Sequence, residues 1–134
     1  MSLTETKSQI QRTGEATRRS VLGDSYVDGT AATATAFDAP FQELITEAAW
    51  GLLWSRSEWS KRDRSIVTIA LLAGLGHYDE MAMHIRATAR TGASEADIRE
   101  ALLHVAIYAG VPAANAAFRV AKQVFAEIEA DKGE

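Results

Sequence analysis

The stretch that decides the fold reads SIVTIALLAGLGHYDEMAMHIRATARTG and spans residues 65–92. Its first part is almost wholly apolar, which is typical of a helix that is buried on every side. Gly76 interrupts the pattern, and residues 78–91 then carry apolar side chains at helical spacing up to Gly92, where a glycine commonly follows the last turn. The stretch therefore predicts a buried helix over residues 61–75 and a second helix over residues 78–91.

Three segments precede this pair of helices. Residues 1–20 are mostly polar and predict a helix that ends near Arg19. Residues 21–36 hold glycines, aspartates and small residues without helical periodicity, so they predict a long loop, and such loops are usually functional or disordered. Residues 37–56 predict a helix that Asp38 begins. Its apolar stripe consists of Phe41, Leu44, Ile45, Ala48, Ala49 and Leu52.

Two further helices follow the central pair. Ser94 and Asp97 match a capping box, in which each side chain bonds to the backbone N–H of the other residue, and Gly110 stops the helix that they begin. Pro112 then opens a last helix, rich in alanine, that runs to about residue 130. Apolar residues alternate with period two nowhere in the sequence. We therefore expect an all-α fold, a bundle of about six helices.

Length and composition predict one domain over residues 1–134, with its helical core at 37–132. Of the residues, 47% are hydrophobic and 24% charged, which is ordinary for a globular protein. The formal net charge is −4 and the cations form no block, so we expect neither nucleic-acid nor membrane binding. No apolar run is long enough for a membrane span or a secretory signal. The absence of cysteine excludes disulfides and thiol catalysis and fits a cytoplasmic location.

His77, Glu80 and His84 lie at i, i+3 and i+7 and project from one face of the helix predicted over residues 78–91. A metal site on this face is disfavoured, because about 10.5 Å of helix separates the two histidines, too far for both to reach one ion. Acid–base catalysis would use Glu80 to orient His84 and to raise its pKa. An ordinary solvated Glu–His pair explains the same spacing, and spacing alone favours it.

Three further side chains are candidates for ligand binding. Arg64 lies in the first turn of the helix predicted over residues 61–75. There it either holds an anion with its fixed guanidinium or forms a surface or intersubunit salt bridge. Trp50 and Trp54 lie four residues apart on one side of their helix. They are either core or interface tryptophans, which the residue type favours, or the aromatic wall of a ligand pocket.

Five segments together resemble the carboxymuconolactone decarboxylase family, within the alkylhydroperoxidase D-like superfamily, and they cover almost the whole chain. Each is weak alone, but their order and spacing are specific. They are RRSVLGDSYVD (residues 18–28), FQELITEAAWGLLWSR (41–56), RSIVTIA (64–70), the Glu80-x-x-x-His84-x-Arg86 motif and AIYAGVPAANAAF (106–118). The superfamily's redox motif CxxCxxxH falls on His77, Glu80 and His84, so the absence of cysteine excludes peroxidase chemistry.

The resemblance implies a helical fold and the decarboxylation of 4-carboxymuconolactone to 3-oxoadipate enol-lactone and CO₂, in the protocatechuate branch of the β-ketoadipate pathway. It implies neither a metal nor an organic cofactor. His84, oriented by Glu80, becomes the candidate proton donor, and Arg64 and Arg86 become candidate carboxylate binders. The candidate pocket walls are Trp50, Trp54 and Tyr108.

Members of this family form rings, commonly hexamers built as trimers of dimers, so the resemblance also implies a homo-oligomer. The sequence departs from the family pattern at Tyr26 and Gly29, where histidine and arginine are usual. If these positions touch substrate, we expect the departures to change activity or substrate choice. His77 lies outside the family motif. Arg86 points to a different helix face from His84 and either binds substrate or bridges subunits. Two alternatives stay open, a helical oligomer without this activity and a metal-dependent variant.

Overall fold

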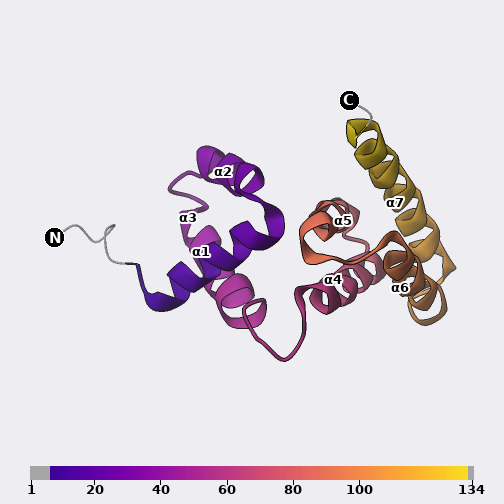
Figure 1. Cartoon of the computed structure of the whole chain (residues 1–134), viewed down its shortest axis with the longest axis horizontal. Helices are drawn as coiled ribbons and strands as arrows, with labels where there is room; N and C mark the ends of the chain where they lie inside the picture. Colours follow the sequence, from indigo (N-terminus) through magenta and orange to yellow (C-terminus); the bar gives the residue numbers. More distant parts are fainter. Residues whose placement is uncertain (1–6, 133–134) are drawn as a thin grey trace. The chain divides into compact units, whose positions relative to one another are not determined.

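The computed structural model describes residues 7–132 of the chain, which divides into two compact units, Met1–Trp59 and Ser60–Glu134 (Figure 1). Both units are helical, and no strand occurs among the described residues, which confirms the all-α prediction. No helix among them is long and apolar enough to span a membrane. The single domain stays a prediction, because compactness alone does not show whether either unit folds by itself.

The first unit is built on the packing of helix α1, Gln9–Leu22, against the π-helical segment η2, Thr46–Leu53. Glycines on both elements permit a close approach. A Cβ atom on Gly14 would lie 2.1 Å from the carbonyl oxygen of Thr46, and one on Gly51 would lie 2.8 Å from a side-chain atom of α1. Both distances are too short for any side chain, so these positions let the two backbones meet.

Residues 21–36 do not form the loop that the sequence predicts, because helix α2, Asp24–Thr33, occupies most of them. Arg19 of α1 holds this helix in place, since its guanidinium contacts the carboxylates of Asp24 at 3.1 Å and Asp28 at 2.9 Å. The two aspartates are one turn apart and share a helix face. The segment is thus helical without an apolar period of its own, and ion pairs with α1 and the buried side chain of Val27 accompany it.

A second correction concerns the helix predicted over residues 37–56. The structure divides it into α3, Ala39–Ile45, and η2, in which the Trp54 N–H bonds to the carbonyl of Ala49, five residues back, at 2.8 Å. A π-helical turn takes more residues than an α-helical turn, so one apolar stripe of period 3.6 cannot face the core along both parts. Trp50 and Trp54 are buried instead. The stripe members left exposed are Phe41, Leu44, Ala48 and Leu52.

The second unit consists of α4, Lys61–Leu75; α5, Tyr78–Thr91; α6, Glu95–Tyr108; and α7, Val111–Lys132. Helix α4 packs against α5 and α6, and the long α7 packs along all three (Figure 1). Their shared core consists of Ile69, Ala73, Met81, Ile85, Ala93, Ile98, Leu102, Val105, Ala114, Ala117, Ala121 and Val124.

The structure confirms the turn signals of this unit. Gly76 has a left-handed backbone conformation with φ of 79°, which ends α4 and lets the chain reverse into α5. Ser94 and Asp97 form the predicted capping box at the start of α6. The hydroxyl of Ser65 donates to that of Thr91 at 2.7 Å, so the start of α4 lies beside the end of α5. The two helices therefore form an antiparallel hairpin.

We predict that Gly14→Ala destabilises the protein by about 1–3 kcal/mol, since overpacking against backbone atoms forces α1 and η2 apart. Gly29→Ala is the matched control, because nothing lies within 4 Å of a Cβ atom on this helical glycine. The control should stabilise the protein by about 0.5–1 kcal/mol, because alanine lowers the entropy of the unfolded chain. Urea unfolding followed by circular dichroism measures both changes. Equal effects would contradict the close approach of α1 and η2.

Candidate active site

The α4–α5 hairpin carries two buried ionisable side chains. Arg64 of α4 and His84 of α5 are each 8% exposed, and with Ser65 they make up the buried polar and charged residues of the described chain. Ser65 is satisfied by its hydrogen bond to Thr91. Removing a guanidinium and an imidazole from water is unfavourable, so such groups are rarely buried without a reason. Their burial makes this hairpin the candidate active site.

His84 lies within the apolar core side of α5. Met81 and Ile85, its neighbours on this side, are fully buried. Burial lowers the pKa of His84 to about 4, because surroundings of low dielectric constant disfavour the charged imidazolium. At neutral pH and without a ligand, the imidazole is therefore uncharged.

Glu80 does not orient His84 as the sequence predicts. Its side chain is exposed, and within the described residues it makes no hydrogen bond to His84. A spacing of i, i+4 permits such a contact but does not enforce it. The predicted direction of the pKa shift is also wrong, because burial lowers the pKa of His84 where a carboxylate partner would raise it. A catalytic role for Glu80 stays a prediction.

Arg62 and Arg64 have different surroundings although both lie in the first turn of α4. Arg62 is exposed and donates to both carboxylate oxygens of Asp97, at 3.1 Å from Nε and 2.7 Å from Nη2, which ties α4 to α6. Arg64 is buried, which excludes its interpretation as a solvated surface cation. That it binds a carboxylate stays a prediction.

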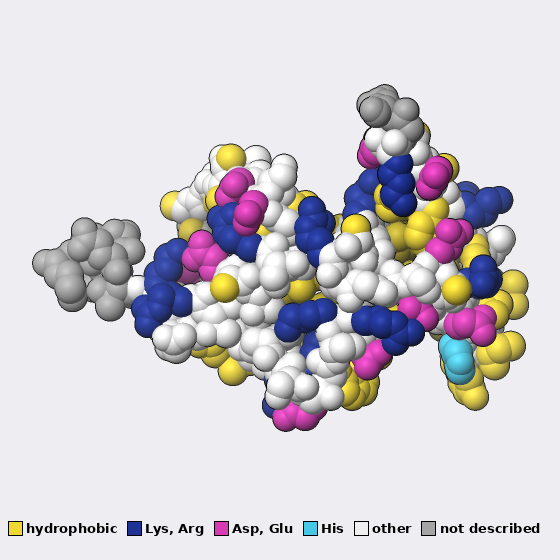
Figure 2. All heavy atoms as spheres, in the orientation of Figure 1, with side chains coloured by type: hydrophobic (Ala, Val, Ile, Leu, Met, Phe, Trp, Pro, Cys, Tyr) yellow, Lys and Arg dark blue, Asp and Glu magenta, His cyan; other side chains and the backbone are white. Residues whose placement is uncertain are grey.

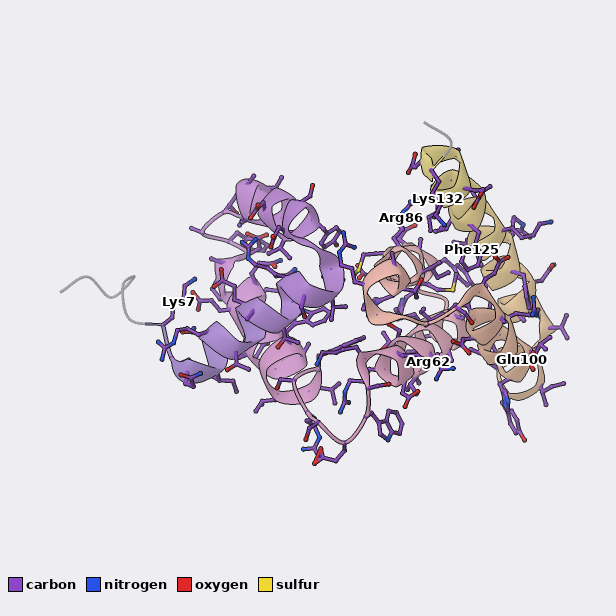
Figure 3. The ribbon with its side chains drawn as sticks, viewed as in Figure 1. Lys7, Arg62, Arg86, Glu100, Phe125 and Lys132 are labelled. Atoms are coloured by element: carbon purple, nitrogen blue, oxygen red, sulfur yellow. The ribbon has the colours of Figure 1, made fainter. Side chains whose placement is uncertain are left out.

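Arg86 has a partner inside the second unit. Its guanidinium forms an ion pair with Glu127 of α7. Figure 3 labels Arg86. The two side chains are 45% and 44% exposed, and an exposed pair of this kind contributes at most about 1 kcal/mol to stability. The ion pair gives Arg86 a structural role, and its role as a carboxylate binder stays a prediction.

The aromatic candidates fall in different places. Trp50 and Trp54 are buried in the first unit, with ring centroids 5.1 Å apart and ring planes inclined by 33°. Burial and ring packing are compatible with a core, an interface or a pocket wall, so the wall role of Trp50 and Trp54 stays a prediction. Tyr108, at the end of α6, is 85% exposed and stacks on His104 with a centroid separation of 6.3 Å. An exposed ring encloses no pocket within its own unit, so a wall role for Tyr108 requires a further surface against it.

The three side chains of the predicted face, His77, Glu80 and His84, differ in their exposure to solvent. His77 and Glu80 are exposed, whereas His84 is buried. In the part of the chain from residue 7 to residue 132, no three acidic or histidine side chains lie close enough together to bind a metal ion. What distinguishes these two packed helices is one buried arginine and one buried histidine, side chains that can hold an anion and move a proton, respectively.

Arg18 is a charged residue of interest that sequence analysis passes over. It lines a cavity in the first unit together with Arg19. The sequence signal is the pair of adjacent arginines, because neighbours in a helix point in different directions and so meet different partners. Only the structure shows that Arg19 contacts three carboxylates whereas Arg18 bonds to the Gln42 amide.

A family profile and two decarboxylases of known name are similar to this chain. The sequence profile of the carboxymuconolactone decarboxylase family matches residues 39–123, which include the whole α4–α5 hairpin. A 4-carboxymuconolactone decarboxylase of Acinetobacter baylyi is 39% identical over 120 residues, which are 90% of this chain and 90% of that protein. A nitrosuccinic acid decarboxylase of Metarhizium robertsii is 38% identical over 138 residues, which are 100% of this chain and 96% of that protein.

The depressed pKa of His84 predicts a pH dependence of stability. Its value in the folded protein, about 4, lies below the ordinary value of 6.5, so the unfolded chain binds more protons between these values. Stability is therefore lost as the pH falls through this window, by about 2 kcal/mol from this group between about pH 7 and pH 5. His84→Gln should remove this loss, whereas His104→Gln, at an exposed position, should leave it.

Urea unfolding of the three proteins at the two pH values measures the effect. The same pH dependence in the wild type and in His84→Gln would contradict the burial of a neutral imidazole.

Proposed function

This chain belongs to the carboxymuconolactone decarboxylase family, and we propose that it releases CO₂ from 4-carboxymuconolactone to give 3-oxoadipate enol-lactone. The observation that carries this proposal is the hairpin with buried Arg64 and His84, which lies in the segment that the family profile matches. Further support comes from the Acinetobacter baylyi relative named for this substrate, which is similar over 90% of the chain.

The substrate supplies its own electron sink. It is a γ-lactone that bears a carboxylate on the γ carbon and an acetate arm. Loss of that carboxylate as CO₂ leaves an electron pair, which delocalises through the ring double bond onto the lactone carbonyl oxygen. The protein must then hold the acetate arm, stabilise the dienolate oxygen and deliver one proton to the α carbon. None of these steps requires a metal or an organic cofactor.

Arg64 holds the retained carboxylate in this proposal. A guanidinium matches a carboxylate in a planar, bidentate arrangement, and burial strengthens the interaction because little water competes for either group. The same burial leaves the departing carboxylate poorly solvated, which favours its conversion to neutral CO₂.

His84 is the proton donor, and its burial determines when it is charged. Without a ligand it is neutral at pH 7, because its pKa is about 4. An opposite charge within about 4–6 Å raises a histidine pKa by about 1–3. The bound anionic substrate therefore raises the protonated fraction of His84, to about half at pH 7 for the largest such shift. After CO₂ has left, the imidazolium gives this proton to the α carbon and returns to its neutral form.

Nitrosuccinic acid is a second candidate substrate, and the alignment of the whole chain with the Metarhizium robertsii relative favours it. The chemistry is equivalent. Loss of the carboxylate on the nitro-bearing carbon leaves an electron pair that the nitro group accepts, and one carboxylate arm remains. Tyr26 and Gly29, where the chain departs from the family pattern, are the positions that we propose to bear on the choice between the two.

We further propose that the second unit carries an assembly surface. A Cβ atom on Gly74 would lie 3.5 Å from that of Ala109, so the ends of α4 and α6 are adjacent. Hydrophobic side chains gather on the surface of this unit (Figure 2). Contiguous apolar surface of this kind is typical of interfaces, so it supports assembly between copies of the chain. The trimer of dimers that we propose, and its cytoplasmic location, rest on the family resemblance. The large exposed hydrophobic residues on the second halves of α4 and α6 and at the start of α7 are Leu71, Leu75, Leu103, Ile107, Tyr108 and Val111.

Decarboxylation by the purified protein tests the proposed function. With 4-carboxymuconolactone we expect enol-lactone and CO₂ in equal amounts, and a parallel reaction with nitrosuccinic acid decides between the substrates by kcat/KM. His84→Gln should lower kcat by about 10²–10⁴-fold, the usual contribution of a positioned proton donor. His77→Gln, at an exposed position, should leave kcat within about twofold.

Turnover of neither substrate would refute the function and leave the family membership intact. A near-wild-type kcat for His84→Gln would instead remove this histidine from the chemistry.

Paired substitutions separate the two roles considered for Arg86. If it only ties α5 to α7, Arg86→Gln and Glu127→Gln each break the same ion pair, and we expect similar losses of stability, at most about 1 kcal/mol, with equal KM values. Thermal unfolding and steady-state kinetics of both variants measure these quantities. A KM that rises for Arg86→Gln alone would show that Arg86 binds the substrate.

A further inference from the structure

The first unit contains a cavity of about 630 Å³ lined by residues of α1, α2, α3 and η2. Sites for small organic ligands commonly have volumes of about 300–1,000 Å³, so this cavity is large enough for a metabolite. All its lining residues lie between residues 7 and 46, within one unit. Those with charged side chains are Lys7, Glu15, Arg18, Arg19 and Glu43.

Two of the three cations at this cavity already have carboxylate partners. The guanidinium of Arg19 contacts three carboxylates, those of Glu15 at 3.8 Å, Asp24 at 3.1 Å and Asp28 at 2.9 Å. Lys7 pairs with Glu15 at 2.6 Å. The charges of Arg19 and Lys7 are thus matched within the unit.

Arg18 has different surroundings, although it is adjacent to Arg19. Its side chain is partly buried, and Nη1 donates to the neutral amide oxygen of Gln42 at 3.3 Å. No carboxylate of the described residues lies within ion-pair distance of it, and its buried Nε has no hydrogen-bond partner among them. Burial lowers the pKa of Arg18, and the phenol of Tyr26 only partly offsets this effect.

A partly buried guanidinium without an anionic partner is unfavourable, and a carboxylate would supply both the missing charge and the missing acceptors. The remaining anions of the cavity do not fill this role. Glu15 is engaged by Lys7 and Arg19. Glu43 is exposed, so water solvates its charge. The charge left for a ligand to match is therefore the positive charge of Arg18.

We propose that this cavity binds a small molecule that bears a carboxylate, and that Arg18 is its anion anchor. The planar guanidinium offers two parallel N–H donors, which fit the two oxygens of a carboxylate. The carboxylate comes either from the substrate or product of the decarboxylation or from a separate carboxylic acid. The binding itself rests on the geometry of the first unit and not on the proposed function.

NMR spectra of the arginine Nε–H groups, recorded on the full chain with succinate as the probe, test this proposal. We expect the Arg18 signal to move with saturation as succinate is added. Arg12 is the matched reference, because it lies on the same helix, outside the cavity, and bonds to the Lys7 carbonyl and the Gln9 side chain. Its signal should stay in place. Succinamide, which has a similar shape without charge, should move neither signal.

Titration calorimetry of variants gives a second measurement. Arg18→Gln should raise the Kd for succinate by about tenfold or more, as expected when a charge-assisted bidentate contact is lost, and Arg12→Gln by less than about twofold. Arg18→Lys, which keeps the charge but loses the fork, should lie between them. An unmoved Arg18 signal in the wild type, or equal Kd values for Arg18→Gln and Arg12→Gln, would overturn the proposal.

Inhibition of decarboxylation by succinate distinguishes the two sources of the carboxylate. Competitive inhibition that Arg18→Gln relieves identifies the substrate or product as the occupant. Binding at Arg18 without competition identifies a separate carboxylic acid. Because the NMR measurement needs no turnover, failure of this proposal and failure of the decarboxylase assignment are separate results.

Discussion

The second unit depends on the packing of α4 against α5, and each of these helices carries one buried ionisable side chain, Arg64 and His84. Ile69, Met81 and Ile85 are fully buried in the same core, so the surroundings of the hairpin are apolar. In such surroundings the imidazole loses its proton well below neutral pH, and its affinity for a proton becomes sensitive to any anion that arrives. Helix packing thus converts an ordinary histidine into one whose charge depends on the ligand.

The sequence predicts this hairpin well because its signals are local. Gly76 ends α4 through its own backbone conformation, and the capping box of Ser94 and Asp97 needs only three residues of separation. The first unit is predicted less well, since contacts distant in sequence decide its structure. Helix α2 depends on Arg19 of the preceding helix, and the α1–η2 contact depends on Gly14 meeting the backbone of a segment about thirty residues later.

In the candidate site too, some features follow from local sequence and others depend on contacts between helices. The family motif locates His84, and its place beside Met81 and Ile85 in the helical pattern agrees with its burial. The direction of its pKa shift depends on how much of the ring the neighbouring helices cover, and spacing within one helix carries no such information. For Glu80, the spacing within the helix allows a hydrogen bond to His84, but the exposed side chain does not make it. Arg18 becomes distinct from its neighbour only once α2 supplies the carboxylate partners of Arg19 and α3 supplies Gln42.

The pH profiles of kcat/KM and kcat, measured separately, test the central claim that His84 gains its proton only with an anionic ligand. The first profile reports the free protein and the second reports the complex. We predict that kcat/KM falls about tenfold per pH unit above about pH 4, because the free imidazole is then neutral. We predict that kcat begins to fall only about 1–3 pH units above the pH at which kcat/KM begins to fall, because the bound anion raises the pKa of His84. Profiles that decline together from the same pH, or that both stay flat over this range, would contradict the claim.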